Sequence, residues 1–224
     1  MSPSSPLLLQ DRAAAGRRLV EPLRQYAHRP DVIVLALPRG GVPVAYEVAM
    51  ALEVRLDLML VRKLGAPSNE EFALGAIASG GIQILNDHAL RAHPIDQATF
   101  DAVVAREKRE LLRREQAYRG TREPVPLKDQ VVILIDDGLA TGASMMAAIQ
   151  AVRLQAPSRI VVAVPVAPIE TVEALRSEVD ELICPVVPDW FMSLGHWYMD
   201  FSQTSDAEVI KLLQRARQRE AGIE

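Results

Sequence analysis

The sequence predicts an α/β fold, an open, twisted and mainly parallel β-sheet with helices on its faces. Apolar runs of strand length alternate with segments of helical periodicity, which is the pattern of a parallel sheet with crossover helices. Runs such as "VVILI" (131–135) are apolar at every position, as a buried strand requires. The chain has 224 residues, of which 49% are hydrophobic and 24% charged, so a single domain over 1–224 is the simplest organisation.

The core of this domain is expected over about residues 12–185. Its first element is a helix over 12–27, with Asp11 as the N-cap and an apolar face formed by Leu19, Val20, Leu23 and Tyr26. Further strands are expected at 32–37, 55–61, 131–135, 159–166 and 181–187, and further helices at 42–54, 95–119, 143–155 and 168–178.

Three other segments complete the expected domain. Residues 64–81 are rich in small and polar residues with weak periodicity, which predicts a long, flexible loop whose residues 65–80 are among the least ordered. A small hood is expected over about 185–205. A C-terminal helix over 206–219 should follow, because Ser205 and Glu208 have the spacing of a capping box.

Charge and composition exclude several functions. A net charge of −4 argues against nucleic acid or an acidic membrane as the main partner. The apolar N-terminal run is too short for a signal-peptide core, and no run of about 20 apolar residues follows, so a cytoplasmic protein is expected. The single cysteine, Cys184, lies in the apolar stretch "ELICPVV" and is interpreted as an inert thiol.

The stretch "VVILIDDGLATGAS" (131–144) carries the strongest functional signal. A buried strand delivers Asp136 and Asp137 to its carboxyl end, where ligands bind in parallel sheets. The turn that follows, Ala140, Thr141, Gly142, Ala143 and Ser144, leads into a helix whose unpaired N–H groups can hold a phosphate. It lacks the lysine of a Walker loop, and no GxGxxG follows any strand.

The two acids would repel a phosphate, so they need a different part of the ligand. Ribose hydroxyls or a hydrated divalent cation would suit them, and a ribose 5-phosphate satisfies both halves of the motif. The plainer interpretation is that Asp136 or Asp137 only caps a helix.

This motif resembles the phosphoribosyl-pyrophosphate motif of the type I phosphoribosyltransferases, and the resemblance extends over roughly residues 30–205. It implies that Asp136 and Asp137 hold the 2′ and 3′ hydroxyls of the ribose and that residues 140–144 hold its 5′-phosphate. It also implies a small-molecule substrate, Mg²⁺ and a homodimer. The metal would meet Asp136 and Asp137 directly or indirectly, through the substrate.

Two other strand ends are similar to loops of that family. "LPRGGVP" resembles its pyrophosphate loop, in which Arg39 would supply donors and Gly40 and Gly41 would let backbone N–H groups approach a diphosphate. "VRKLGAP" resembles the start of its mobile catalytic loop, with Lys63 on the pyrophosphate oxygens. Arg39 could instead be a solvated arginine of a turn, and Arg62 only a surface charge.

The resemblance implies nucleophilic attack at C1 of the ribose with loss of pyrophosphate. Negative charge then grows on the leaving group, where Mg²⁺, Arg39 and Lys63 would stabilise it, and a closed loop would exclude water. Asp136, Asp137, Lys63 and Arg39 are therefore the candidate catalytic residues.

The acceptor is suggested by "VPDWFMSLGHWYMDF" (187–201), which resembles the hood of hypoxanthine-guanine enzymes and favours a purine stacked on Phe191 or Trp190. Ala140 replaces the acidic residue of that group, however, and the hood lysine has no counterpart. The aromatic residues could also form a hydrophobic lid. Two other functions stay open. The chain could be a non-catalytic regulatory protein that binds phosphoribosyl pyrophosphate or a nucleotide. It could also be a metal-dependent hydrolase, although the sequence lacks His and Asp ligands at a suitable spacing.

Overall fold

The computed structural model describes residues 8–67, 69–92 and 95–222. A five-stranded sheet forms its centre, in the order β2-β1-β6-β7-β8. The strands are β1 (Val32–Ala36), β2 (Arg55–Leu58), β6 (Val131–Ile135), β7 (Arg159–Ala163) and β8 (Glu181–Ile183). Each neighbouring pair is parallel, so the carboxyl ends of all five strands lie along one edge. The predicted α/β fold with a mainly parallel sheet is therefore confirmed.

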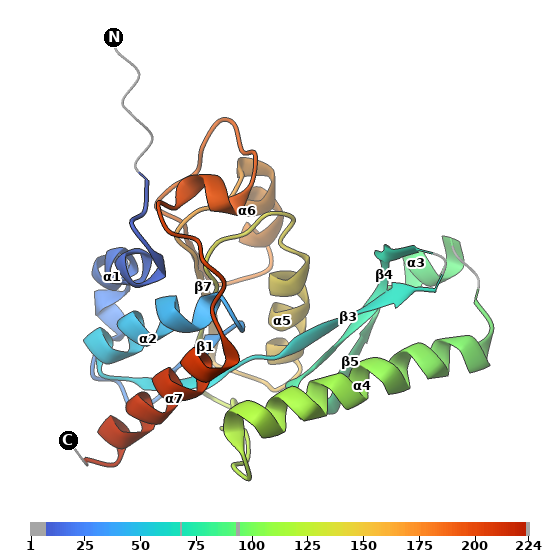
Figure 1. The fold of residues 1–224 in the computed structure, drawn as a ribbon, viewed down its shortest axis with the longest axis horizontal. Helices are drawn as coiled ribbons and strands as arrows, with labels where there is room; N and C mark the ends of the chain where they lie inside the picture. Colours follow the sequence, from blue (N-terminus) through green and yellow to red (C-terminus); the bar gives the residue numbers. More distant parts are fainter. Residues whose placement is uncertain (1–7, 68, 93–94, 223–224) are drawn as a thin grey trace.

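Helices cover both faces of this sheet (Figure 1). One face carries α1 (Arg12–Leu23), α2 (Gly41–Leu52) and α7 (Asp206–Glu220), and the other carries α5 (Ala143–Arg153) and α6 (Ile169–Arg176). Alternate residues of β6 serve the two faces, because Ile133 and Ile135 belong to one buried cluster and Val132 and Leu134 to the other. Burial on both sides explains why this strand is apolar at every position.

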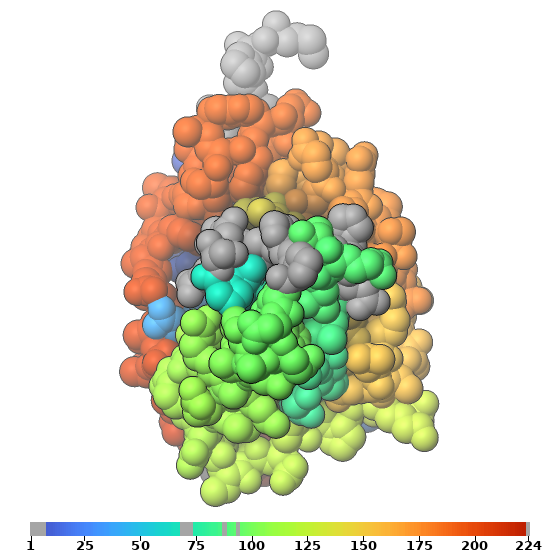
Figure 2. Space-filling model, turned by 90° about the vertical axis from the view of Figure 1, so that its right-hand side faces the viewer, coloured from blue at the N-terminus to red at the C-terminus, as the bar shows by residue number. Residues whose placement is uncertain are grey.

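A second sheet projects from the first as an arm (Figure 1). It is antiparallel, in the order β3-β4-β5, and consists of β3 (Val61–Ala66), β4 (Asn69–Ala78) and β5 (Ile82–Leu85). Two helices, α3 (Asp87–Ala92) and α4 (Gln97–Arg119), follow β5. Seen from the arm's side, the yellow-green residues of α4 form much of the lower front surface (Figure 2).

Most of the segment 64–81, expected as a long, flexible loop, belongs to β3 and β4; residue 68 lies outside the described residues. Small residues hide the strands from a periodicity analysis, but the packing requires them. A Cβ atom at Gly75 would lie 2.2 Å from the carbonyl oxygen of Ile84 on the next strand. The flexibility expected for residues 65–80 stays a prediction.

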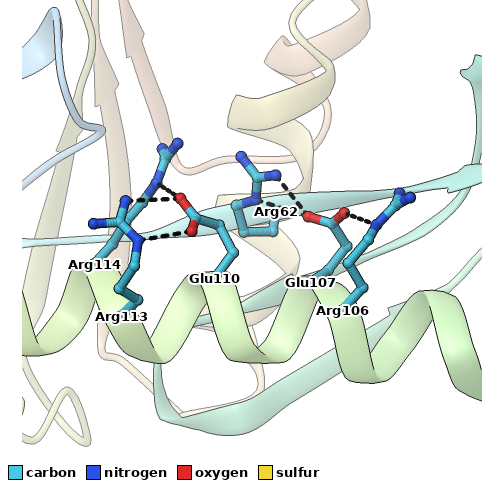
Figure 3. Close-up of polar contacts among 6 residues, drawn as sticks. All are labelled: Arg62, Arg106, Glu107, Glu110, Arg113 and Arg114. Carbon is cyan, nitrogen blue, oxygen red and sulfur yellow. Dashed lines mark hydrogen bonds and ion pairs between the residues drawn. The ribbon is translucent and has the colours of Figure 1, made fainter.

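A buried carboxylate attaches the arm's sheet to α4 (Figure 3). Glu107 is 5% exposed and lies 2.7 Å from the guanidinium of Arg62 on β3, while Arg106 is 2.9 Å from its other oxygen. Burial makes such a pair sensitive to the loss of either partner. Arg62 is thus a structural contact between β3 and α4.

Further ion pairs on α4 differ in burial and therefore in importance. Glu110 pairs with Arg113 and Arg114, each at 2.8 Å, and these hydrogen bonds lower the pKa of Glu110 to about 2 (Figure 3). These side chains are about a third to more than half exposed, so their contribution to stability is small. By contrast, Arg119 and Asp57 of β2 form a buried pair at 3.0 Å, which joins the end of α4 to the central sheet.

The N-terminal segment is attached to the hood, residues 185–205. The amide of Leu9 donates to the carbonyl oxygen of Trp197, and the amide of Met199 donates to the carbonyl oxygen of Leu9, both at 2.8 Å. Leu9 is 1% exposed, so this segment is part of the core although it precedes the first helix. Residues 1–7 lie outside the described residues, and among the described helices none is both long and apolar enough to span a membrane.

Candidate functional site

The acid pair follows β6 directly, at the carboxyl edge of the sheet. Asp137 is 8% exposed and Asp136 is half-buried. The amide of Asp137 donates to Oδ1 of Asp136 at 2.8 Å. Burial of its carboxyl group raises the pKa of Asp136 well above the usual value, and the charge of Asp137 adds to this rise.

The glycine loop between β1 and α2 lies against this acid pair. The Pro38–Arg39 peptide bond is cis, and Gly41 begins α2. A Cβ atom at Gly40 would lie 2.0 Å from Oδ2 of Asp137, and one at Gly41 would lie 2.9 Å from the Cα of Asp136. Only residues without a side chain permit this approach, so the two motifs that the sequence separates by about 100 residues form one site.

The turn after the acid pair leads into α5. Gly142 is the N-cap, with the left-handed backbone φ of 71° that favours glycine. The hydroxyl of Thr171 on α6 donates to the carbonyl oxygen of Ala140 at 2.6 Å and so holds the turn from behind. The residues that the turn exposes are Ala140, Thr141, Ala143 and Ser144. Hydroxyl groups and the first N–H groups of α5 are thus available to an anion.

Arg39 is directed toward α7 in this structure. Its Nη1 lies 3.6 Å from Oδ1 of Asp206, the first residue of that helix. The hydroxyl of Tyr118 donates to the same oxygen at 2.7 Å, and burial together with this hydrogen bond raises the pKa of Tyr118 to about 12.

Lys63 lies on β3, across a cavity from the start of α5. The cavity has a volume of about 470 Å³ and separates the arm from α5. Lys63, Ala143 and Ser144 line it, so the structure brings together residues from two of the motifs. A volume of this size suits a small organic ligand.

The hood aromatics lie in three different environments. Trp190 is 69% exposed, whereas Phe191 is half-buried and packs against the main hydrophobic cluster. Trp197 is 7% exposed and belongs to that cluster. Phe191 and Trp197 thus pack on the core. Of these three side chains, Trp190 is the one that is mostly exposed to solvent.

Two residues that contact the acid pair had no role assigned from the sequence: Arg12, which lies outside the motifs, and Tyr198, which lies within the hood stretch 187–201. Nε of Arg12, the first residue of α1, donates to Oδ2 of Asp137 at 2.7 Å, and the hydroxyl of Tyr198 donates to the carbonyl oxygen of Asp137 at 2.5 Å. Arg12 had one available signal, because a cation in the first turn of a helix opposes the helix dipole and needs a compensating anion.

The residues fit a metal ion only in part. Among the described residues, no group of three or more His, Cys, Asp or Glu side chains is arranged to hold one. Asp136 and Asp137 are two carboxylates, and Mg²⁺ is commonly held by one or two carboxylates together with water and substrate phosphates. The site therefore suits a cation that arrives with a diphosphate.

A parallel sheet whose central strand ends in an acid pair, beside a glycine loop and a helix N-terminus, defines an α/β protein with a candidate anion site at the carboxyl edge of its sheet. The family model of the phosphoribosyl transferase domain matches residues 8–201, and the chain belongs to this family. Its recognition as a type I phosphoribosyltransferase from the 131–144 motif is therefore confirmed.

Named relatives agree with this assignment. A protein of Mycobacterium tuberculosis named "Putative phosphoribosyl transferase Rv0571c" is 43% identical over 209 residues, which is 93% of this chain and 47% of the relative. The chain thus spans about half the length of the curated relatives it matches. The crystal structure of TT1426 from Thermus thermophilus is 44% identical, with a TM-score of 0.82 over 93% of this chain and 98% of that one. The AQ2163 protein of Aquifex aeolicus, at 12% identity and a TM-score of 0.51 over 82% of this chain and 78% of that one, shares the fold.

Proposed function

We propose that this chain transfers the 5-phosphoribosyl group of phosphoribosyl pyrophosphate to a nitrogenous base, with a purine favoured, and releases pyrophosphate. The observation that carries the proposal is the close approach of the glycine loop to the acid pair, 2.0 Å from a Cβ position on Gly40 to Oδ2 of Asp137. A diphosphate on the backbone of that loop and a ribose on the acids would be neighbours, as they are within a single sugar diphosphate.

Each part of the site has a distinct task in this proposal. The turn over 140–144 and the start of α5 bind the 5′-phosphate through N–H and hydroxyl donors. Asp136 and Asp137 accept hydrogen bonds from the ribose hydroxyls and hold the sugar while its C1 becomes electron-deficient. Gly40 and Gly41 give the diphosphate access to backbone N–H groups, so the loop stabilises charge that develops on the leaving group.

Two cationic side chains assist from the rim. Arg39 leaves its ion pair with Asp206 and binds the diphosphate. Little stability is lost in this change, because the 3.6 Å ion pair is partly exposed. Lys63 approaches from β3 across the cavity that it shares with Ser144. Bound Mg²⁺ would neutralise the diphosphate, and its protein ligands would be Asp136 and Asp137, directly or through the substrate.

In this proposal, side chains of the hood bind the acceptor base. An exposed aromatic face stacks on a planar base with about 1–3 kcal/mol in nucleic-acid complexes, and Trp190 offers such a face. Phe191, the other candidate, would have to leave its contacts with the core. Because Ala140 supplies no carboxylate to accept a ring proton, a 6-oxopurine should be a slow acceptor.

The test is a transfer assay with labelled phosphoribosyl pyrophosphate and Mg²⁺ against adenine, guanine, hypoxanthine, xanthine and uracil. Pyrophosphate release that requires both a base and the metal is the expected result, and Asp137→Asn should abolish it. Replacing Trp190 by Ala should lower kcat/KM for the acceptor and leave phosphoribosyl-pyrophosphate binding nearly unchanged.

Binding without turnover of any of the five bases would overturn the transferase proposal and establish the regulatory alternative, in which the protein binds phosphoribosyl pyrophosphate or a nucleotide without catalysis. No binding at all would reject the site. A homodimer, which sedimentation would detect, and a cytoplasmic location belong to the same proposal.

A further inference from the structure

Arg12 joins three parts of the molecule that meet at the acid pair. Its Nε donates to Oδ2 of Asp137 at 2.7 Å, and its Nη1 donates to the carbonyl oxygen of Ser202 at 2.6 Å. The guanidinium carbon also lies 4.1 Å from the centre of the Phe201 ring, within the range of a cation–π contact. With 12% of its side chain exposed, Arg12 is held by α1, by the strand end of β6 and by the hood together.

These contacts constrain which oxygen of Asp137 can meet a ligand. Arg12 takes Oδ2, and the backbone of Gly40 lies on the same oxygen. The hydroxyl of Tyr198 fixes the main chain of Asp137 through its carbonyl oxygen at 2.5 Å. Within the described part of the chain no hydrogen bond reaches Oδ1, so this oxygen is the one that remains for a sugar hydroxyl.

An arginine fork is suited to orienting a carboxylate. Its donors have a fixed planar geometry, and the stacked ring and the Ser202 carbonyl prevent rotation of the guanidinium. The positive charge also offsets the repulsion between Asp136 and Asp137, which follow one another in the chain. Without Arg12, the carboxylate of Asp137 could rotate about its side chain and would lose its defined direction.

We infer that Arg12 is a positioning residue for sugar recognition, which orients Asp137 so that Oδ1 accepts a ribose hydroxyl. The inference rests on the proposed function, because it assigns the ligand of Asp137 as a ribose. Arg12 touches Asp137 and not the reacting atoms. The attachment of Leu9 and Gln10 to the hood at Trp197, Met199 and Asp200 brings Arg12 to this position, so the N-terminal segment becomes part of the substrate site.

The experiment compares Arg12→Met and Arg12→Lys with Arg18→Met, which removes an exposed arginine from the same helix. NMR titration would measure the affinities for ribose 5-phosphate, 2-deoxyribose 5-phosphate, 3-deoxyribose 5-phosphate and inorganic phosphate. The wild type and Arg18→Met should prefer ribose 5-phosphate over at least one deoxy analogue. Arg12→Met should bind ribose 5-phosphate about 10- to 100-fold more weakly, by analogy with the loss of a residue that orients a metal ligand. The preference for ribose 5-phosphate should fall toward one.

A purely structural role predicts a different pattern. General damage to the site would weaken all four ligands by the same factor and leave the preference intact, and this result would overturn the inference, as would unchanged affinities. Arg12→Lys keeps the charge but lacks the planar fork, in which separate nitrogens donate to Asp137 and Ser202, so it should restore only part of the preference. If circular dichroism shows that Arg12→Met does not fold, Arg12→Lys replaces it as the test variant. If the wild type binds no sugar phosphate, the proposed function itself fails, which separates the two failures.

Discussion

Replacing Gly40 by alanine tests whether the glycine loop and the acid pair form one site. The backbone of Gly40 has φ −61° and ψ −33°, which alanine adopts without strain, so the only cost is the space for a methyl group. That methyl carbon would lie 2.0 Å from Oδ2 and 2.6 Å from Cγ of Asp137. Because such atoms need at least 3.0 Å, the carboxylate must shift by about 1 Å, which would stretch its 2.7 Å hydrogen bond to Arg12 beyond bonding range.

The expected magnitude follows from this displacement. Overpacking of a close-packed site costs about 1–3 kcal/mol, and the reduced freedom of the unfolded chain returns about 0.4–1 kcal/mol for glycine to alanine. The net loss is then about 0–2.6 kcal/mol. Its midpoint of about 1.3 kcal/mol should lower the melting temperature by about 3–5 °C in a domain of this size. Affinity for phosphoribosyl pyrophosphate should fall about 10-fold or more, because the displaced carboxylate loses a charged hydrogen bond to the ribose. Such a bond contributes about 1.5–3 kcal/mol, and about 1.4 kcal/mol corresponds to a factor of ten.

Calorimetry would measure both the unfolding and the binding, with Gly195→Ala as the matched control. A methyl group at Gly195 would meet the Phe201 ring at an ordinary 3.4 Å, so this variant should melt within about 2 °C of the wild type. In an Asp137→Ala background the clash is removed, and Gly40→Ala should then cost almost nothing. An equal cost of Gly40→Ala in both backgrounds would refute the contact between the loop and the carboxylate.

Three further predictions concern ionisable groups. First, the pKa of Asp136 is raised in the folded protein, so ionisation of this carboxyl group destabilises the fold as pH rises from its unfolded pKa near 4 through its folded pKa. Asp136→Asn should therefore be more stable than the wild type at pH 7, and the difference in unfolding free energy, measured by urea titration, should grow with pH over this interval. A difference independent of pH would contradict the raised pKa. Second, Glu107→Gln should lower the free energy of unfolding by about 1–3 kcal/mol and speed hydrogen exchange in β3, because Arg62 loses a buried partner. Glu110→Gln removes a partner from an exposed pair and should lower it by less than about 1 kcal/mol. Equal losses would mean that burial does not decide the contribution of these pairs. Third, burial raises the pKa of Cys184 to about 11. At pH 8 its thiol should therefore react with an alkylating agent about 100-fold more slowly in the folded protein than in the urea-unfolded protein. Comparable rates would show that the thiolate forms readily in the folded protein.

Contiguous signals in the sequence were sufficient for the central sheet and for the composition of the candidate site. β6 could be predicted because every position of 131–135 is apolar, and the residues that give its carboxyl end chemical meaning follow at once in the chain. The same applies to the Ser205 cap of α7, whose hydroxyl accepts from the amide of Glu208 at 3.1 Å. In each case the relevant residues are within a few positions of one another, so local pattern and local structure coincide.

The arm shows where the sequence pattern fails. The strands β3 and β4 contain glycine and alanine where bulkier apolar residues would mark a strand, and the reason is the close approach at Gly75, which only the pairing with β5 creates. Similarly, a charged residue such as Arg62 has no evident role until α4 brings Glu107 to it. Strand pairing and helix packing join residues far apart in the chain, and no local pattern encodes them.

The site divides along the same line. By itself, the sequence grouped Asp136, Asp137 and the following turn as candidates for binding a ribose 5-phosphate, because they form one continuous motif. Only the tertiary structure decided that Gly40 lies on Asp137, that Arg39 pairs with Asp206, and that Arg12, 125 positions before Asp137, holds its carboxylate. The physical reason is that the orientation of a side chain depends on contacts in space, and a buried carboxylate takes its direction from whichever donors the fold places beside it.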